Sequence, residues 1–249
     1  MGEATPTVRA LAALALAVPA ACAPAHGAAQ TPVEGEVRQL VTFRFLPGRS
    51  GEGLEILRER AVPFYDNDDA MLSFRAFREI ESSVPLDLIV VRGFRGMRGM
   101  DTSGERLREL ATEQGTSMGA FYERMGAILA GHTDEFVEML PGFGTGDPSA
   151  TPRTALVWYR VAPGSGEEFE RALAGVVAWE TDEGLPTSSG RFLLSDGWHY
   201  LRFLGFESLG DYQDYWAGVR TVAAHESVEQ LTVLRREVIV SSVSDLAIR

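Results

Sequence analysis

Short stretches with an apolar residue at every second position recur along the chain and predict eight β-strands. This two-residue period is typical of half-buried strands. Longer stretches between them carry apolar residues three and four positions apart, as amphipathic helices do. The predicted strands are residues 38–46, 71–79, 86–94, 133–140, 154–162, 188–195, 198–206 and 234–243. The predicted helices are residues 51–65, 102–130, 167–180 and 209–231.

Local signals set several boundaries of these elements. A Pro-Gly pair at residues 47–48 and another at residues 163–164 each end a strand, because proline cannot continue a ladder and the pair favours a turn. The long helical stretch 102–130 is expected to break near Gly115. Thr102 and Ser208 each precede an acidic residue by three positions, which predicts a capping box at two helix starts.

The same order of elements occurs twice, which predicts an internal duplication. Each copy is expected to be strand, helix, strand, strand, helix, strand. Four matched segments keep their order and nearly constant spacing. They pair residues 41–48 with 157–164, 51–54 with 166–169, 62–66 with 177–181 and 92–97 with 204–209. We therefore predict a first repeat over residues 37–140, a linker over 141–152 and a second repeat over 153–245.

The predicted fold class is α+β, with two tandem ferredoxin-like repeats. In each repeat, two helices cover one face of a four-stranded antiparallel sheet. The uncovered face still carries apolar residues and needs a partner, which the second repeat can supply. The two sheets would then close into one α/β barrel with the helices outside, so that a single chain forms a pseudo-dimer.

The segments 43–48 and 158–169 resemble the dimeric α/β-barrel superfamily, which includes antibiotic biosynthesis monooxygenase-like and NIPSNAP-like proteins. In these segments a short strand leads through Pro-Gly into a Glu-rich helix start. The resemblance covers residues 37 to 245 as two copies. It implies the barrel fold but not one activity, because the superfamily includes oxygenases, isomerases, haem-handling enzymes and proteins of unknown role.

The sequence departs from the haem-degrading members of that superfamily. Those members use an asparagine on the first strand, a tryptophan after the third strand and a histidine on the second helix. Thr42 and Trp158 occupy the first of these regions here, Phe94 and Phe206 the second, and Trp216 the third. We therefore predict no haem degradation and no tightly held cofactor.

The first 29 residues differ from the rest of the chain and are interpreted as a secretory signal peptide. Arg9 precedes an apolar stretch, residues 10–18, that is too short to span a bilayer, and small residues follow it. Residues 19–22 also resemble a bacterial lipobox, with Cys22 as the candidate lipidated residue. The protein is predicted to be exported, either periplasmic or secreted, with a lipid anchor at the cell envelope as an alternative. A plain N-terminal helix is the competing interpretation.

Composition excludes several classes of function. The 249-residue chain has a formal net charge of −12, which disfavours binding to nucleic acid. Its single cysteine excludes a disulfide framework, a cysteine-based zinc site and an iron–sulfur cluster. No histidine pair has a metal-ligand spacing, so no metal is predicted. Motifs for a P-loop, a dinucleotide site or a serine nucleophile elbow are also missing from the sequence.

Strand alternation suggests that several arginines and aromatic residues point into the barrel lumen. Arginine binds carboxylates and phosphates through a planar set of donors, and aromatic rings supply apolar contact area. Such a lumen would bind a small anionic or aromatic molecule. Alternatively, the arginines pair with carboxylates and hold the two halves together. The candidate ligand-binding residues are Arg44, Arg92, Trp158, Arg160, Tyr200 and Arg202.

Two functions follow from this sequence. The first is an exported barrel protein that binds a small anionic organic molecule in its lumen, with cofactor-independent oxygenase-type activity as an extension. The second is a non-catalytic envelope protein that uses the barrel as a structural or partner-binding platform. A cavity with unpaired arginines favours the first function. A lumen filled by side chains and closed by arginine–carboxylate pairs favours the second.

Overall fold

The computed structural model describes residues 35–82 and 87–248. The predicted signal peptide, residues 1–29, and the candidate lipidation site Cys22 lie outside the described residues. The described chain is a mixed α+β protein with eight strands. These are β1 (Glu36–Phe45), β2 (Met71–Ser82), β3 (Leu88–Arg95), β4 (Leu129–Gly144), β5 (Arg153–Val161), β6 (Thr187–Leu194), β7 (Tyr200–Phe206) and β8 (Thr232–Ile248).

The eight strands form one closed barrel in the order β1-β3-β2-β8-β5-β7-β6-β4, with antiparallel pairing throughout. The first four strands are contiguous, in the order β4-β1-β3-β2, and the last four follow the matching order β8-β5-β7-β6. Pairing of β2 with β8 and of β4 with β6 joins the two sets. The barrel therefore has two such junctions, and its closure leaves no free sheet edge.

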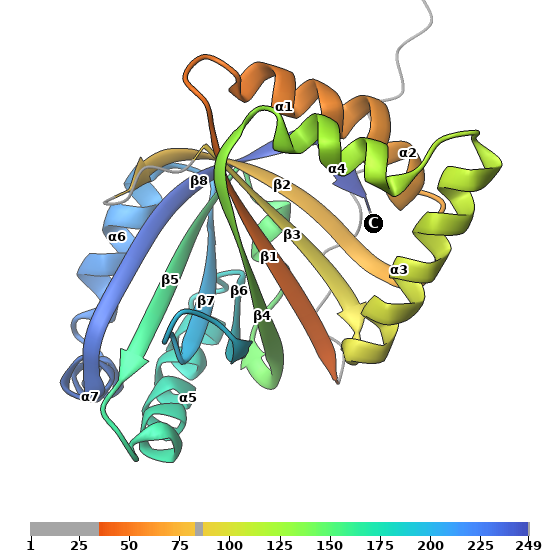
Figure 1. The fold of residues 1–249 in the computed structure, drawn as a ribbon. Helices are drawn as coiled ribbons and strands as arrows, with labels where there is room; N and C mark the ends of the chain where they lie inside the picture. The colour runs from red at the N-terminus through yellow and green to blue at the C-terminus, as the bar shows by residue number, and fades with distance from the viewer. Residues whose placement is uncertain (1–34, 83–86, 249) are drawn as a thin grey trace, which may run out of the picture.

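Helices cover the outside of the barrel, and those of the two halves lie over different strands (Figure 1). In the first half, a π-helical turn, Leu57–Ala61, separates two short helices. In each half, the second predicted helical stretch is divided into two helices. The first-half helices are α1 (Ser50–Ile56), α2 (Val62–Tyr65), α3 (Gly96–Glu113) and α4 (Met118–Gly126). The second-half helices are α5 (Gly166–Asp182), α6 (Leu209–Val219) and α7 (Ala223–Leu231).

Apolar residues gather into three clusters. One lies between the first-half strands and their helices, and a second lies between the second-half strands and theirs. The third draws on both halves and contains residues such as Leu40, Phe77, Trp158 and Phe203. Because neighbouring residues of a strand point to opposite faces, this third cluster lies inside the barrel.

The predicted strands and helices are present, but several bounds differ from those expected. β4 and β8 extend beyond both predicted ends, and the predicted helix 209–231 is divided into α6 and α7. Gly115 has φ +67° between α3 and α4, as expected of the glycine that breaks this helical stretch. Ser208 forms the predicted capping box. The predicted cap at Thr102 is wrong, because α3 begins at Gly96 and the Thr102 hydroxyl donates to a carbonyl one turn earlier. Residues 141–144 of the predicted linker instead continue β4.

Within residues 35–82 and 87–248, every helix is too short or too polar to cross a membrane.

Candidate functional site

Within residues 35–82 and 87–248, side chains fill the barrel interior where the binding cavity was predicted. Its central layer consists of apolar residues from seven of the strands. Eleven of these are almost completely buried: Leu40, Phe77, Ile89, Val137, Met139, Leu156, Trp158, Leu201, Phe203, Val238 and Val240. A layer packed in this way stabilises the fold and leaves no room for a ligand.

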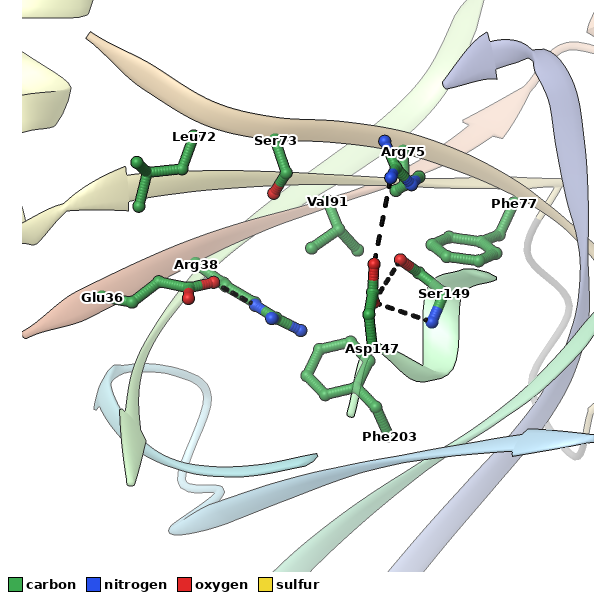
Figure 2. A pocket seen from close by; sticks show the side chains of 10 residues that line it. All are labelled: Glu36, Arg38, Leu72, Ser73, Arg75, Phe77, Val91, Asp147, Ser149 and Phe203. Carbon is green, nitrogen blue, oxygen red and sulfur yellow. Dashed lines mark hydrogen bonds and ion pairs between the residues drawn. The ribbon is translucent and has the colours of Figure 1, made fainter. Parts of the chain in front are cut away.

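Ion pairs close one end of this interior (Figure 2). Arg38 Nε lies 2.6 Å from a Glu36 carboxylate oxygen, and an Arg75 nitrogen lies 3.9 Å from an Asp147 carboxylate oxygen. The cavity beside them holds about 20 Å³, enough for one water molecule. This end therefore matches the structural alternative, in which buried arginines pair with carboxylates.

Trp158 lies in the interior as predicted, but it serves as a packing residue. Its side chain is fully buried, and its Nε1 donates to Glu135 Oε2 at 3.0 Å. The Arg236 guanidinium lies 3.9 Å from the centre of its indole ring. Because its ring and its only donor both contact protein groups, Trp158 presents no free polar atom to a ligand.

Burial raises the pKa of Glu135, while the Trp158 hydrogen bond and the charge of Arg236 partly oppose the rise. The folded state then binds this proton more tightly than the unfolded state, so stability is expected to fall as the pH rises above the ordinary pKa of about 4.5. Glu135→Gln keeps an acceptor for the indole and removes the titration. Thermal melts of both proteins from pH 4.5 to 7 should show wild type losing stability relative to the variant. A pH-independent difference would contradict this prediction.

Arg44 and Arg160 follow the interior-facing alternation but lie at the barrel end rather than in a lumen. Arg44 is exposed. Arg160 donates from Nε to the Gly197 carbonyl at 2.7 Å and from Nη2 to the Asp196 carbonyl at 3.2 Å. It therefore tethers the turn between β6 and β7, and the two arginines do not share one site with Trp158.

The prediction that Arg92, Tyr200 and Arg202 point into the lumen is wrong. All three face the helices, because Ile89 and Val91 of β3 and the equivalent residues of β7 occupy the interior. Tyr200 stacks on Phe169 of α5 and its hydroxyl lies 2.9 Å from Glu170. The six candidate residues therefore divide between the interior, the barrel end and the two helix-facing layers.

In the second half, a buried ion pair fills the space between strands and helices. Two hydrogen bonds run from Arg202 Nη2 to the two Glu180 carboxylate oxygens, at 2.6 and 2.5 Å. Tyr215 and Thr187 donate to the same carboxylate at 2.8 and 3.1 Å. Burial lowers the pKa of Arg202, but the Glu180 carboxylate more than compensates and holds it above its ordinary value. This charge pair is satisfied internally.

In the first half, the corresponding layer contains a pocket of about 640 Å³, which we call the α4 pocket. Its volume is within the usual range for small-molecule sites. It lies between β1, β3 and β4 on one side and α2, the π-helical turn and α4 on the other. The lining residues are Gln39, Val41, Phe43, Leu57, Tyr65, Phe74, Val90, Arg92, Phe121, Tyr122, Met125, Gly126, Leu129, Ala130, Gly131, His132 and Asp134.

A chain of polar groups crosses the floor of the α4 pocket. Arg92 donates through Nη2 to Gln39 Oε1 and through Nη1 to the Tyr65 hydroxyl at 3.3 Å. Gln39 donates to Asp134 Oδ1 at 2.5 Å, and Asp134 Oδ2 lies 3.5 Å from His132 Nε2. Arg92 Nε is buried and has no acceptor among the described residues. Within that part of the chain, Arg92 also has no ion pair with a carboxylate.

Strand pairing shows which residues of the two halves correspond. Val41 and Val157 occupy equivalent positions on β1 and β5. Val41 pairs with Asp134 of β4, as Val157 pairs with Glu237 of β8. Both halves therefore place a carboxylate on this strand, facing the helices. In the second half, Tyr212 and Trp216 of α6 pack beside that carboxylate; the first-half layer keeps the α4 pocket instead.

Sequence reasoning selected Arg92 but missed its surroundings. Gln39, His132 and Asp134 lie on the helix-facing side of β1 and β4, whereas the candidate residues were predicted for interior positions. Tyr122 is exposed and belongs to α4. The useful signal was the break at Gly115, because it separates α4 from α3 and lets α4 form a wall of the pocket.

The described residues do not include the histidine expected for haem degradation or a group of side chains suited to hold a metal ion. Trp216, in the position expected for a haem-binding histidine, is packed against Tyr215 and His225, with ring centres 5.3 and 5.8 Å away. His132 is the one histidine lining the α4 pocket, and its side chain is 55% exposed beside Asp134. Among the described residues, no three histidine, cysteine or acidic side chains are grouped to hold a metal ion.

No protein-family model and no curated protein matches the sequence. Solved structures do match. A proposed monooxygenase from Lactobacillus acidophilus is 12% identical, with a TM-score of 0.59, over 86% of this chain and 96% of that one. An anthrone oxidase-like protein is 11% identical, with a TM-score of 0.55, over 85% and 92%. Chlorite dismutase from Candidatus Nitrospira defluvii, in complex with imidazole, is 10% identical, with a TM-score of 0.54, over 86% and 94%.

At these identities the similarity establishes the fold and not the activity. The similarity extends over most of this chain and of each neighbour, so it concerns the whole barrel. The narrower resemblance to NIPSNAP-like proteins stays a prediction. The chain has the ferredoxin-like α/β-barrel fold of these monooxygenase-like and chlorite dismutase-like proteins.

Proposed function

We propose that this protein binds a small anionic organic molecule in the α4 pocket, with Arg92 as the contact for the anionic group. The observation that carries the proposal is the Arg92 guanidinium, which has no carboxylate partner among the described residues and lies at the floor of a pocket of about 640 Å³. A half-buried guanidinium without a carboxylate partner favours an anion, because desolvation makes an unpaired charge costly. The comparable arginine of the second half, Arg202, is already neutralised by Glu180.

The walls of the pocket indicate an apolar or aromatic ligand body. Phe43, Phe121 and Tyr122 line it together with aliphatic side chains such as Val90. Rings of this kind supply large contact areas, and a few polar groups then orient the ligand. The binding site is thus assigned to the helix-facing side of the first-half strands rather than to the lumen.

An oxygenase-type reaction without a bound cofactor is a second candidate. Two observations favour it. Structural neighbours include a proposed monooxygenase and an anthrone oxidase-like protein. The pair His132 and Asp134 also lies in the pocket lining, where an imidazole beside a carboxylate can exchange a proton with a ligand. The platform hypothesis accounts for the filled interior but gives no role to the α4 pocket.

Calorimetric titration with benzoate and 1-naphthoate tests the binding proposal. Arg92→Gln removes the charge, and Arg95→Gln is the matched control because Arg95 also lies on β3 but is exposed and outside the pocket. We expect Arg92→Gln to weaken binding by about tenfold to a hundredfold, the loss typical of a charge-assisted hydrogen bond, and Arg95→Gln to match wild type. No binding to the wild-type protein, or equal binding to all three proteins, would overturn the proposal.

Two further proposals concern the origin and location of the chain. We infer that the halves arose by duplication, which is supported by their matching strand orders and by the left-handed glycines Gly48 and Gly164, at φ +77° and +82°, in both Pro-Gly turns. Export, with or without a lipid on Cys22, is proposed from residues 1–29 alone.

A further inference from the structure

We infer that the ligand of the α4 pocket is a monocarboxylate, whose carboxylate contacts Arg92 in the way that Glu180 contacts Arg202 in the second half. The inference rests on the proposed function and narrows it to one chemical class. Its basis is a comparison within the molecule. In the second half, a carboxylate of the chain itself pairs with the arginine. In the first half, an open pocket lies at the corresponding place.

Glu180 shows what this layer of the fold accepts as a partner for an arginine. Its two carboxylate oxygens accept hydrogen bonds from Arg202, Tyr215 and Thr187 at 2.5 to 3.1 Å. Its side chain is completely buried. A planar carboxylate suits a guanidinium because both groups present their polar atoms in one plane. The second half therefore holds an internal example of arginine–carboxylate recognition.

Tyr65 occupies the position that corresponds to Glu180. The matched segments 62–66 and 177–181 align these two residues. Arg92 is two residues further along β3 than the position equivalent to Arg202. Its side chain lies on the same face of the sheet, and its guanidinium contacts the Tyr65 hydroxyl. A π-helical turn, Leu57–Ala61, precedes Tyr65, and Leu57 lines the pocket. Such turns are frequent at functional sites. With Tyr65 where the second half has Glu180, Arg92 has no carboxylate from this position and none in an ion pair among the described residues.

The charges of the pocket favour a ligand with one negative charge. Arg92 is the one arginine among the lining residues, and no lysine is present among them. Asp134 adds a negative charge to the same lining, and a dianion would be repelled by it. A phosphate or a dicarboxylate is therefore a poorer match than a monocarboxylate. The aromatic walls of the pocket indicate that this carboxylate is attached to an apolar body.

Three matched probes distinguish the chemical classes: 1-naphthoate, 1-naphthamide and 1-naphthyl phosphate. They share one ring system and differ in the charge and shape of the polar group. Titration of the wild-type protein is expected to give 1-naphthoate at least about a tenfold lower Kd than either of the others. Tighter or equal binding of the amide or the phosphate would overturn the monocarboxylate assignment.

A second experiment introduces a carboxylate at Tyr65, the first-half position equivalent to Glu180. Tyr65→Glu should pair with Arg92 internally and weaken 1-naphthoate binding by at least about tenfold relative to Tyr65→Gln, which has the same size without the charge. Thermal melts of both variants show whether each is folded. Equal binding by the two folded variants would contradict the inference, and the wild-type probe series stands even if Tyr65→Glu does not fold.

The two proposals fail in different ways. If none of the three probes binds, the α4 pocket is not a site for such molecules and the proposed function fails. If the phosphate binds best, and Arg92→Gln weakens that binding, the pocket binds anions but the monocarboxylate assignment is wrong. If the neutral amide binds best, the anionic ligand of the proposed function is wrong as well.

Discussion

Replacing Glu180 by leucine is expected to lower the free energy of unfolding by about 3–5 kcal/mol, the cost of leaving a buried charge without its partner. Arg202 has only 2% of its surface exposed, so water cannot replace the lost carboxylate. Tyr215 and Thr187 would lose their acceptor at the same time. Urea denaturation followed by circular dichroism measures the change.

A double variant separates the lost pair from the lost volume. Glu180→Leu combined with Arg202→Met removes both charges and keeps apolar side chains of similar length. It is expected to be more stable than Glu180→Leu alone, because no unpaired charge remains. Arg191→Met is a control for removing an arginine from a partly exposed ion pair with Glu138 and should cost less than about 1 kcal/mol. A double variant as unstable as the single one would show that the ion pair is not the cause.

Trp158→Ala is expected to cost about 3–5 kcal/mol, the usual loss when a large buried aromatic side chain is truncated. The change leaves a cavity in the barrel interior and takes away the hydrogen bond to Glu135. It also removes the ring that lies against Arg236. Because the interior cluster joins both halves of the chain, we expect loss of stability in the whole barrel and one cooperative unfolding transition.

Trp198 provides a matched control for this substitution. Its indole is only partly buried at the edge of the same interior cluster, and it lies near Arg160 and Arg236. Trp198→Ala is therefore expected to cost clearly less than Trp158→Ala when both are unfolded in urea. A similar loss for the two variants would contradict the assignment of Trp158 to the packed interior. Binding of 1-naphthoate should survive in Trp158→Ala as long as the protein is folded, since Trp158 does not line the α4 pocket.

Two of the arginines that strand alternation suggested as ligand contacts have structural roles instead. Arg202 is a structural residue paired with Glu180, and Arg160 holds a turn. Arg92 is the candidate whose surroundings still fit a ligand. Its proposed binding role does not involve the barrel interior, so stability and binding can be measured separately in the same variants.

The sequence alone was sufficient to predict the eight strands, the matched order of elements in the two halves and the helix break at Gly115. These features depend on local chemistry: two-residue alternation, Pro-Gly turns and glycine at a left-handed position. Strand ends were less accurate, as with β4, which continues to Gly144 where a linker beginning at residue 141 was expected. A long strand that joins the two halves of the barrel, as β4 does by pairing with β1 and β6, is stabilised by partners distant in the sequence, which local patterns do not reveal.

The face taken by each arginine was decided by the tertiary structure. β3 begins with Leu88, Ile89, Val90 and Val91, all buried, so its sequence shows no alternation from which the inward face could be identified. Closure of the barrel placed Ile89 and Val91 inside and turned Arg92 toward the helices. The α4 pocket likewise depends on where α4 lies after the break at Gly115. Local patterns thus determined the elements, while long-range packing decided which polar side chains meet and where space for a ligand remains.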